Sequence, residues 1–231
     1  MLDTVNTLKR DADLVLLNTD GSVMRRCVRA RNFAIDWFRA GRGSTLEFAS
    51  DEETMLLLFD AAGDISGAGR GAIAPRRSVS VVPAGSYQLK LSEPGSGGIL
   101  STHRRDPQAA VNAASYQTPD PRIAPVGSAW PRIKSADDIR VYEIDAFKAP
   151  ADNPRLKMLQ SATMSINWVD YDGPRDRKAL SPHAHADFEQ ASLAVAGDFV
   201  HHLRVPWSKN AEEWREDEHK LAPSPSVLVI P

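Results

Sequence analysis

Two histidines and a carboxylate lie close together in residues 182–189 of this chain. His183 and His185 are two residues apart, and Glu189 follows four residues after the second histidine. Because successive side chains of an extended strand point to opposite faces, this spacing predicts that all three share one face. Two neutral imidazoles and one carboxylate form a facial metal triad, which leaves coordination positions open for water, oxygen or substrate. The sequence therefore predicts metal ligands at His183, His185 and Glu189.

The same stretch also allows a plainer interpretation. Pro182 and the alanine spacers beside the histidines are compatible with a surface loop that carries two solvated imidazoles. A His-x-His pair followed by a glutamate is modest support for a metal site, and the β-rich context and the turn at Gly197 strengthen it. We keep the surface loop as the alternative to the metal site.

Four further side chains near the triad are candidates for a second shell or for substrate contact. His201 and His202 are consecutive in a strand-like run, so one faces inward and the other outward. The inward histidine has three possible roles: a hydrogen bond to a ligand or substrate, a fourth metal ligand, or a polar residue of a half-buried barrel with its hydrogen bonds satisfied. We favour the third. Trp207 is a candidate wall of a substrate pocket. His219, in the charged run 216–219, is either a lid residue or part of a solvated surface.

Composition excludes several classes of function. The 231 residues carry a net charge of −2, with 42% hydrophobic and 25% charged residues, so nothing favours nucleic acid as a partner. The longest apolar runs, such as 55–59 and 227–230, are too short to cross a bilayer, and no secretion signal is visible. The single cysteine, Cys27, rules out an internal disulfide and fits a reducing compartment. We expect a cytoplasmic protein that binds neither nucleic acid nor membrane.

Short β-rich runs separated by Gly, Pro, Asp and Ser make up most of the chain, which is the pattern of an antiparallel barrel or sandwich. The two halves also repeat. Residues 78–83 are echoed by 226–231 at an offset of 148, and residues 57–65 by 191–199 at an offset of 134. The second half therefore holds about fourteen extra residues, and the charged segment 206–224 is the expected insertion.

With these motifs, the chain resembles the cupin superfamily, specifically the bicupins, which hold two double-stranded β-helix barrels in one chain. The first cupin motif has the form G-x5-H-x-H-x3/4-E-x6-G, and His183, His185, Glu189 and Gly197 match it. The chain departs from the motif by one extra residue before Gly197 and by lacking the glycine six residues before His183.

The second cupin motif, G-x5-P-x-G-x2-H-x3-N, supplies the fourth metal ligand of the family. Pro83, Ala84 and Gly85 match its P-x-G, but no histidine follows them. The echo places Ala49, Asp51 and Met55 where the second half has its three ligands, so the first barrel is expected to be degenerate. In the second half the sequence stops at the point where this motif would begin, so we expect a truncated second barrel.

The resemblance implies an all-β protein with two cupin-type jelly-roll barrels in tandem, the second incomplete. It implies a degenerate barrel in residues 1–101, a linker in 102–134 and a metal-binding barrel in 135–231. The implied cofactor is a divalent transition metal (Fe2+, Mn2+, Zn2+ or Ni2+), and the implied function is a dioxygenase- or isomerase-like enzyme acting on a small organic molecule. The alternative is a non-catalytic bicupin that binds a small ligand or is purely structural. A homodimer is the expected assembly.

Overall fold

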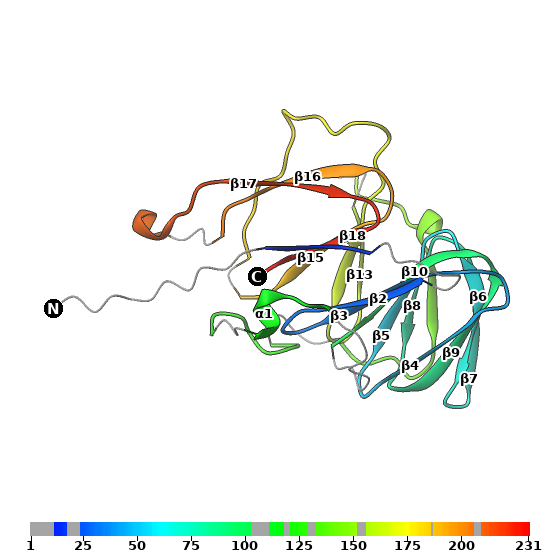
Figure 1. Ribbon diagram of the computed structural model, residues 1–231. Coiled ribbons are helices and arrows are strands. Elements are labelled where there is room, and N and C mark those ends of the chain that lie inside the picture. The colour runs from blue at the N-terminus through cyan, green and yellow to red at the C-terminus, as the bar shows by residue number, and fades with distance from the viewer. Residues whose placement is uncertain are drawn as a thin grey trace.

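Strands dominate the computed structural model, which describes residues 12–17, 24–102, 111–117, 121–128, 133–151, 156–185, 187–205 and 209–231 (Figure 1). The strands are β1 (Asp13–Leu16), β2 (Met24–Arg29), β3 (Ala34–Ala40), β4 (Thr45–Ser50), β5 (Thr54–Leu58), β6 (Ala62–Gly67), β7 (Arg70–Ala74), β8 (Ser78–Val82), β9 (Gly85–Glu93), β10 (Gly95–Ser101), β11 (Val111–Asn112), β12 (Arg140–Glu143), β13 (Lys157–Gln160), β14 (Ser165–Trp168), β15 (Gln190–Ala194), β16 (Asp198–Leu203), β17 (Glu218–Pro223) and β18 (Ser226–Ile230). The helical elements in these ranges are α1 (Ala114–Gln117) and the 3-10 turns η1 (Ile144–Ala146) and η2 (Ala211–Glu213). None of these helices has the length and apolar character that a membrane span needs.

The first barrel is built from two facing sheets. A seven-stranded sheet has the order β11-β2-β3-β10-β5-β8-β12, and a four-stranded sheet has the order β4-β9-β6-β7. On β9, buried Tyr87, Leu89 and Leu91 alternate with exposed residues, as expected of a strand with one face on a core and one in water. Their partners across the barrel include Phe38 and Leu58, so apolar side chains fill its interior.

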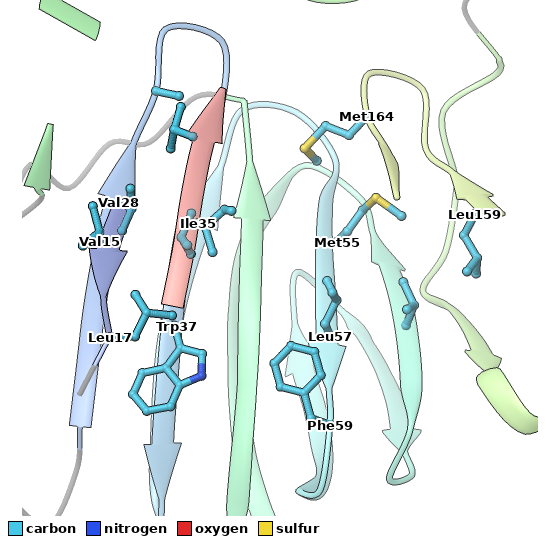
Figure 2. Packing of buried hydrophobic residues seen from close by; sticks show 14 of the residues in the cluster. Val15, Leu17, Val28, Ile35, Trp37, Met55, Leu57, Phe59, Leu159 and Met164 are labelled. Atoms are coloured by element: carbon cyan, nitrogen blue, oxygen red, sulfur yellow. The ribbon is translucent and has the colours of Figure 1, made fainter. Parts of the chain in front are cut away.

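The seven-stranded sheet is covered on its other face as well, which explains why all five residues of β5 are buried. Met55 and Leu57 point away from the first barrel and join a second apolar cluster with Trp37 (Figure 2). Leu159 and Met164 from the second half complete that cluster. Because residues of both halves form this cluster, the halves share one continuous core. Each large apolar side chain that the cluster buries fully contributes about 1.5–3 kcal/mol to the stability of the fold.

Each half lends its first described strand to the sheet of the other. β12, from the second half, pairs antiparallel with β8, and β1, from the first half, pairs antiparallel with β18. The registers correspond as well. Arg140 lies opposite Val81, and Asp13 lies opposite Val229, which is 148 residues after Val81. This reciprocal exchange joins the two halves through backbone hydrogen bonds in addition to the shared core.

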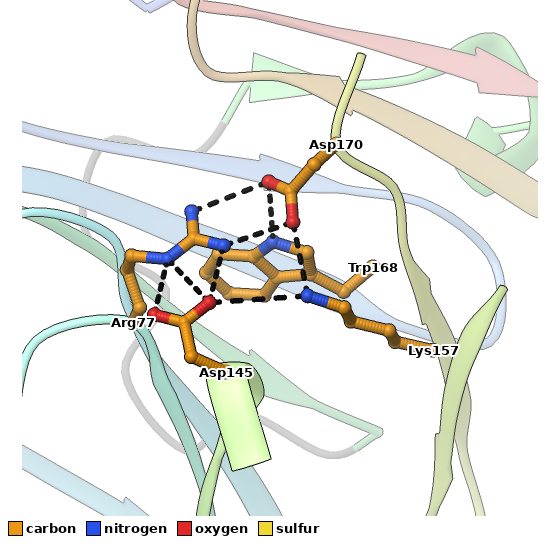
Figure 3. A network of polar contacts seen from close by, with 5 residues as sticks. All are labelled: Arg77, Asp145, Lys157, Trp168 and Asp170. Carbon is orange, nitrogen blue, oxygen red and sulfur yellow. Dashed lines mark hydrogen bonds and ion pairs between the residues drawn. The ribbon is translucent and has the colours of Figure 1, made fainter. Parts of the chain in front are cut away.

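A polar network closes the same junction (Figure 3). Arg77 lies between β7 and β8, and its guanidinium donates to the carboxylates of Asp145 and Asp170 from the second half. Lys157 Nζ lies 3.2 Å from Asp170 Oδ2, and the Arg77 guanidinium sits over the Trp168 ring, 5.8 Å from its centroid. These hydrogen bonds raise the pKa of Arg77 and hold the pKa of Asp170 down at about 2.

Strand pairing gives the repeat its true alignment. Thr54 pairs with Val82 and Gln190 pairs with Ile230, so β15 follows β5 by 136 residues while β18 follows β8 by 148. The offset of 134 expected from the sequence is therefore wrong by two residues. The second half has twelve extra residues rather than about fourteen, and they fall between β16 and β17, where the first barrel turns through Ala68 and Gly69.

The all-β, two-barrel prediction is confirmed, and the second barrel is the less complete one. In the first barrel β5 pairs with β8 and β10, and β6 pairs with β7 and β9. Their counterparts β15 and β16 each have one pairing strand among the described residues, β18 and β17 respectively. The domain limits at 101 and 134 stay a prediction. Strand β12 follows residue 134 but belongs to the seven-stranded sheet of the first barrel, so a division of the chain at these limits does not divide the sheets.

Candidate functional site

The predicted ligands His183 and His185 lie in irregular, exposed chain between β14 and β15. Their ring centroids are 5.0 Å apart in an edge-on arrangement, and His183 Nδ1 lies 2.8 Å from the carbonyl oxygen of Ser181. The His185 ring also packs on Phe188, with centroids 4.1 Å apart. Burial against these neighbours lowers the pKa of His185, and the adjacent His183 lowers it further.

Glu189, the third predicted ligand, is only 8% exposed and is bonded to the first half of the chain. The backbone N–H of Arg31 donates to its Oε1 at 3.1 Å, and that of Asn32 donates to its Oε2 at 2.7 Å. Both donors belong to the turn between β2 and β3 of the first half. The carboxylate is therefore engaged through both oxygens with a turn of the other half, and hydrogen bonds to an ionised acceptor are the strong kind.

The first half contains a matching carboxylate. Glu53 precedes β5 as Glu189 precedes β15, and it is 4% exposed. Its Oε2 accepts the N–H of Ala162 at 2.6 Å, and its Oε1 accepts the N–H of Ala136. Ala162 lies in the turn between β13 and β14, which corresponds to the turn that Glu189 contacts. Each half thus caps a hairpin turn of the other with a buried glutamate.

Among the described residues, His183, His185 and Glu189 are not gathered into one metal-holding group, and their assignment as ligands stays a prediction from the motif. The parity argument holds only on an extended strand, and residues 187–188 form a bend before β15. At the same place in the first barrel, β4 is a strand because β9 pairs with it. Residues 181–185 have no such partner among the described residues, and Asp187 is instead held by its carbonyl to the N–H of Ala124 at 2.7 Å.

The donor set does not fit a metal in this arrangement. Two side chains of the proposed set lie together, and the third is bonded to the first half of the chain. Within the described ranges, no group of three or more His, Cys, Asp or Glu side chains is placed to hold a metal ion. The identity of a metal cofactor stays a prediction that rests on the sequence motif.

His201 and His202 divide between the two faces of β16, as the sequence predicted. His201 faces inward at the position that Ile65 holds in the first barrel, and burial lowers its pKa. Its Nε2 is buried with no hydrogen-bond partner among the described residues. His202 faces outward and meets His219, which lies on strand β17 rather than in a lid or a loop. Trp207 lies outside the described residues.

Sequence reasoning missed a cleft of about 420 Å³ between the two halves. Its walls come from five separate segments and comprise Asp51, Glu52, Glu53, Arg70, Pro83, Ala84, Ser135, Ala136, Asp137, Ala162 and Thr163. The one sequence signal near it is the P-x-G stretch that begins at Pro83. Of the adjoining acidic run 51–53, the sequence repeat singled out only Asp51, as the residue aligned with His185.

Thr163 is the most informative residue of this cleft. It is 7% exposed, and its hydroxyl has no hydrogen-bond partner among the described residues. Arg70, also in the lining, donates from Nε to the carbonyl oxygen of Asp137 at 3.0 Å. A buried hydroxyl without a partner costs free energy unless a water or a ligand satisfies it. The cleft is therefore lined by carboxylates and a guanidinium, with the unsatisfied Thr163 hydroxyl buried in its wall.

Two facing-sheet halves that exchange strands and repeat in register define the class of this protein, which has the bicupin fold. No protein-family model matches the chain, and no curated protein matches its sequence. A Pseudomonas aeruginosa protein whose name describes it as glyoxylate-induced has a similar structure, with a TM-score of 0.52 and 9% identity. That likeness covers 95% of this chain and 80% of the other.

Two further solved structures are similar at lower scores. The 7S globulin of Momordica charantia has a TM-score of 0.49 and 12% identity over 94% of this chain and 75% of its own. An RmlC-like cupin protein from Desulfovibrio desulfuricans has a TM-score of 0.32 and 20% identity over 37% of this chain and 90% of its own. At identities this low, structural likeness establishes the fold and leaves the activity to be argued from the site.

Proposed function

We propose that this protein is a non-catalytic bicupin that binds a small polar molecule in the cleft between its halves. The observation that carries the proposal is the buried Thr163 hydroxyl, which lacks a partner and lines a cleft of about 420 Å³. Sites for small molecules usually measure about 300–1,000 Å³ and place a few polar groups around the ligand. The first barrel supports the same proposal, because apolar side chains fill its interior and the polar lining lies in the cleft between the halves.

The charges of the cleft select the chemistry of the ligand. Four carboxylates line it, from Asp51, Glu52, Glu53 and Asp137, against the single guanidinium of Arg70. Glu53 accepts two backbone N–H groups, and Lys134 pairs with Asp137 at 3.1 Å, but the lining still carries a negative excess. A ligand with an ammonium group and at least one hydroxyl is complementary to these carboxylates and to Thr163.

A thermal-shift screen followed by calorimetry tests this function. Small amino alcohols such as ethanolamine and serinol are compared with glycerol and with acetate on the full chain. We expect an amino alcohol to raise the melting temperature as its concentration exceeds its Kd, because it binds the native state alone. Acetate should have no effect because the cleft repels it.

Matched variants then test whether the ligand binds in the cleft. Thr163→Val removes the buried hydroxyl at nearly constant shape and should weaken binding about tenfold, which is the value of one hydrogen bond. Thr45→Val, at an exposed position of β4, is the control and should bind as the parent does. Equal binding by Thr163→Val and the parent, or no binding of any amino alcohol, would refute the proposed function.

One observation favours a second candidate, a metal-dependent enzyme acting on a small organic molecule. The rings of His183 and His185 already lie 5.0 Å apart, so two imidazoles of the motif are close. A metal centre with Glu189 requires that carboxylate to release the N–H groups of Arg31 and Asn32. Metal analysis of the purified protein decides: about one Fe2+, Mn2+, Zn2+ or Ni2+ per chain, lost in His183→Ala, supports the enzyme. A homodimer and a cytoplasmic location stay predictions, and light scattering tests the former.

A further inference from the structure

Two imidazoles meet on the outer face of the β16–β17 hairpin. His202 on β16 lies directly opposite His219 on β17 in the strand register. Their Nδ1 atoms are 2.7 Å apart, and their ring centroids are 4.8 Å apart with the planes nearly perpendicular. Both residues are exposed, so the pair lies at the protein surface.

The separation of the two nitrogens matches the coordination geometry of particular metals. Two metal–nitrogen bonds of about 2.0 Å at a right angle place their nitrogens about 2.8 Å apart, whereas a tetrahedral angle requires about 3.3 Å. The observed 2.7 Å is the length of an N–H···N hydrogen bond between the two rings, and it is also close to the separation of two neighbouring corners of a square, so a metal could replace the shared proton with little movement of the rings. Square-planar or tetragonal coordination by nitrogen and oxygen is typical of copper(II) and nickel(II), and copper(II) binds more tightly in the Irving–Williams order.

The hairpin holds this pair in place from both ends. Beyond the last strand pair, Arg204 Nε donates to Asp217 Oδ1 at 2.8 Å and so joins the two strands at the base of the long loop. At the other end, the N–H of Ser224 donates to the carbonyl oxygen of Gly197 at 3.2 Å. A pair of ligands fixed by the strands that bear them loses little side-chain freedom on binding, which favours chelation.

The matching hairpin of the first barrel shows that the fold itself does not require the histidines. There Ser66 on β6 lies opposite Gly71 on β7, in the positions that His202 and His219 occupy in the second half. The hairpin forms equally well with neither imidazole. The His202–His219 contact is therefore an addition to a scaffold that is already complete.

We propose that His202 and His219 form a two-imidazole site that binds copper(II), and nickel(II) more weakly. Both rings bind as neutral imidazoles through Nδ1, with the proton of each on Nε2, and water fills the remaining positions. In the described part of the chain no third His, Cys, Asp or Glu completes a protein cage there, so the site is open. This inference is independent of the cleft and of the motif at His183 and His185.

Titration of the full, EDTA-treated chain with copper(II) chloride alone tests the proposal. Calorimetry should give one tight copper(II) per chain, and electron paramagnetic resonance should show a tetragonal signal with coupling to two equivalent nitrogens. His202→Gln and His219→Gln should each weaken binding about a hundredfold, since either change turns a chelate into a single ligand. Nickel(II) chloride should bind the parent with lower affinity than copper(II) does. Each variant should weaken nickel(II) binding by about the same factor as it weakens copper(II) binding.

An outward-facing neighbour on the same strand provides the matched control. Val200→Thr, at a position of β16 that is 53% exposed, should leave copper(II) affinity and the two-nitrogen signal unchanged, because it removes no imidazole. The side chains of His202, His219 and Val200 are exposed, so the variants should keep the parent circular dichroism spectrum. Copper(II) binding that persists in both His202→Gln and His219→Gln, or that is absent from the parent, overturns the proposal.

Discussion

Replacing Glu189 with glutamine changes little in the shape of the side chain but much in its bonding. The two carboxylate oxygens accept the N–H groups of Arg31 and Asn32 at 3.1 and 2.7 Å. An amide has one acceptor oxygen, so its NH2 group would face the second N–H as donor against donor. Glu189 is 8% exposed, and little water can reach the unpaired groups.

The cost follows from the bonds that are lost. A hydrogen bond to a charged group contributes about 1.5–3 kcal/mol, and a buried donor left without a partner costs about 1–3 kcal/mol. We therefore expect Glu189→Gln to lower the free energy of unfolding by about 3 kcal/mol. For a chain of this size that corresponds to a fall in the melting temperature of roughly 6–12 °C.

Urea unfolding followed by tryptophan fluorescence measures this change. Glu53→Gln should show a similar loss, because Glu53 makes the reciprocal contacts with Ala136 and Ala162. Glu47→Gln, at an exposed position of β4, should stay within about 0.5 kcal/mol of the parent. If Glu189→Gln leaves stability unchanged but removes a bound metal, the turn-capping role is wrong and Glu189 is a metal ligand.

Two other predictions test the junction between the halves and the packing of the first barrel. The hydrogen bonds from Arg77 hold the pKa of Asp170 at about 2, below its usual value of 3.8, so the ion pair stabilises the native state above about pH 4 and this contribution is lost as the pH falls toward 2. The stability difference between the parent and Asp170→Asn, measured in urea at pH 6 and at pH 2.5, should therefore shrink on acidification; a constant difference would contradict the ion-pair explanation. Gly97→Ala should cost about 1–3 kcal/mol or more, because an added Cβ would collide with the Phe38 ring and lie 2.5 Å from the carbonyl oxygen of Leu57. Gly98→Ala is its control, since the nearest atom to an added Cβ there is 3.8 Å away, and equal urea midpoints for the two variants would show that the packing argument is wrong.

The β-rich character of the chain could be predicted from local patterns, because the alternation of a strand depends on side chains close in sequence. The alternation of Tyr87, Leu89 and Leu91 with exposed residues identifies β9, and the inward and outward positions of His201 and His202 follow from the same period of two. The exchange of β1 and β12 could not be predicted in this way. Which edge a strand joins depends on partners 59 or more residues away, and one-dimensional periodicity holds no information on that choice.

The candidate site was harder to predict for a related reason. The shared face of His183, His185 and Glu189 was inferred by assuming an extended strand, and a strand exists only where a neighbour supplies its hydrogen bonds. The cleft at Thr163 was missed because its walls come from five segments that meet only in the folded chain. Its acidic run 51–53 carries no spacing that distinguishes a binding wall from a solvated turn.

The internal repeat separates the role of Glu189 from that of the histidines before it. In the first barrel, aligned by strand pairing, Glu47 and Ala49 stand where His183 and His185 stand in the second, so no imidazole is available there. Yet Glu53 stands at the position of Glu189, is equally buried and binds the corresponding turn of the opposite half. The carboxylate makes corresponding contacts in both barrels, whereas histidines lie beside it in only one. The contacts between the halves therefore account for the presence of a glutamate at this position. The glutamate of the motif is thus a link between barrels, and the motif histidines need an explanation of their own.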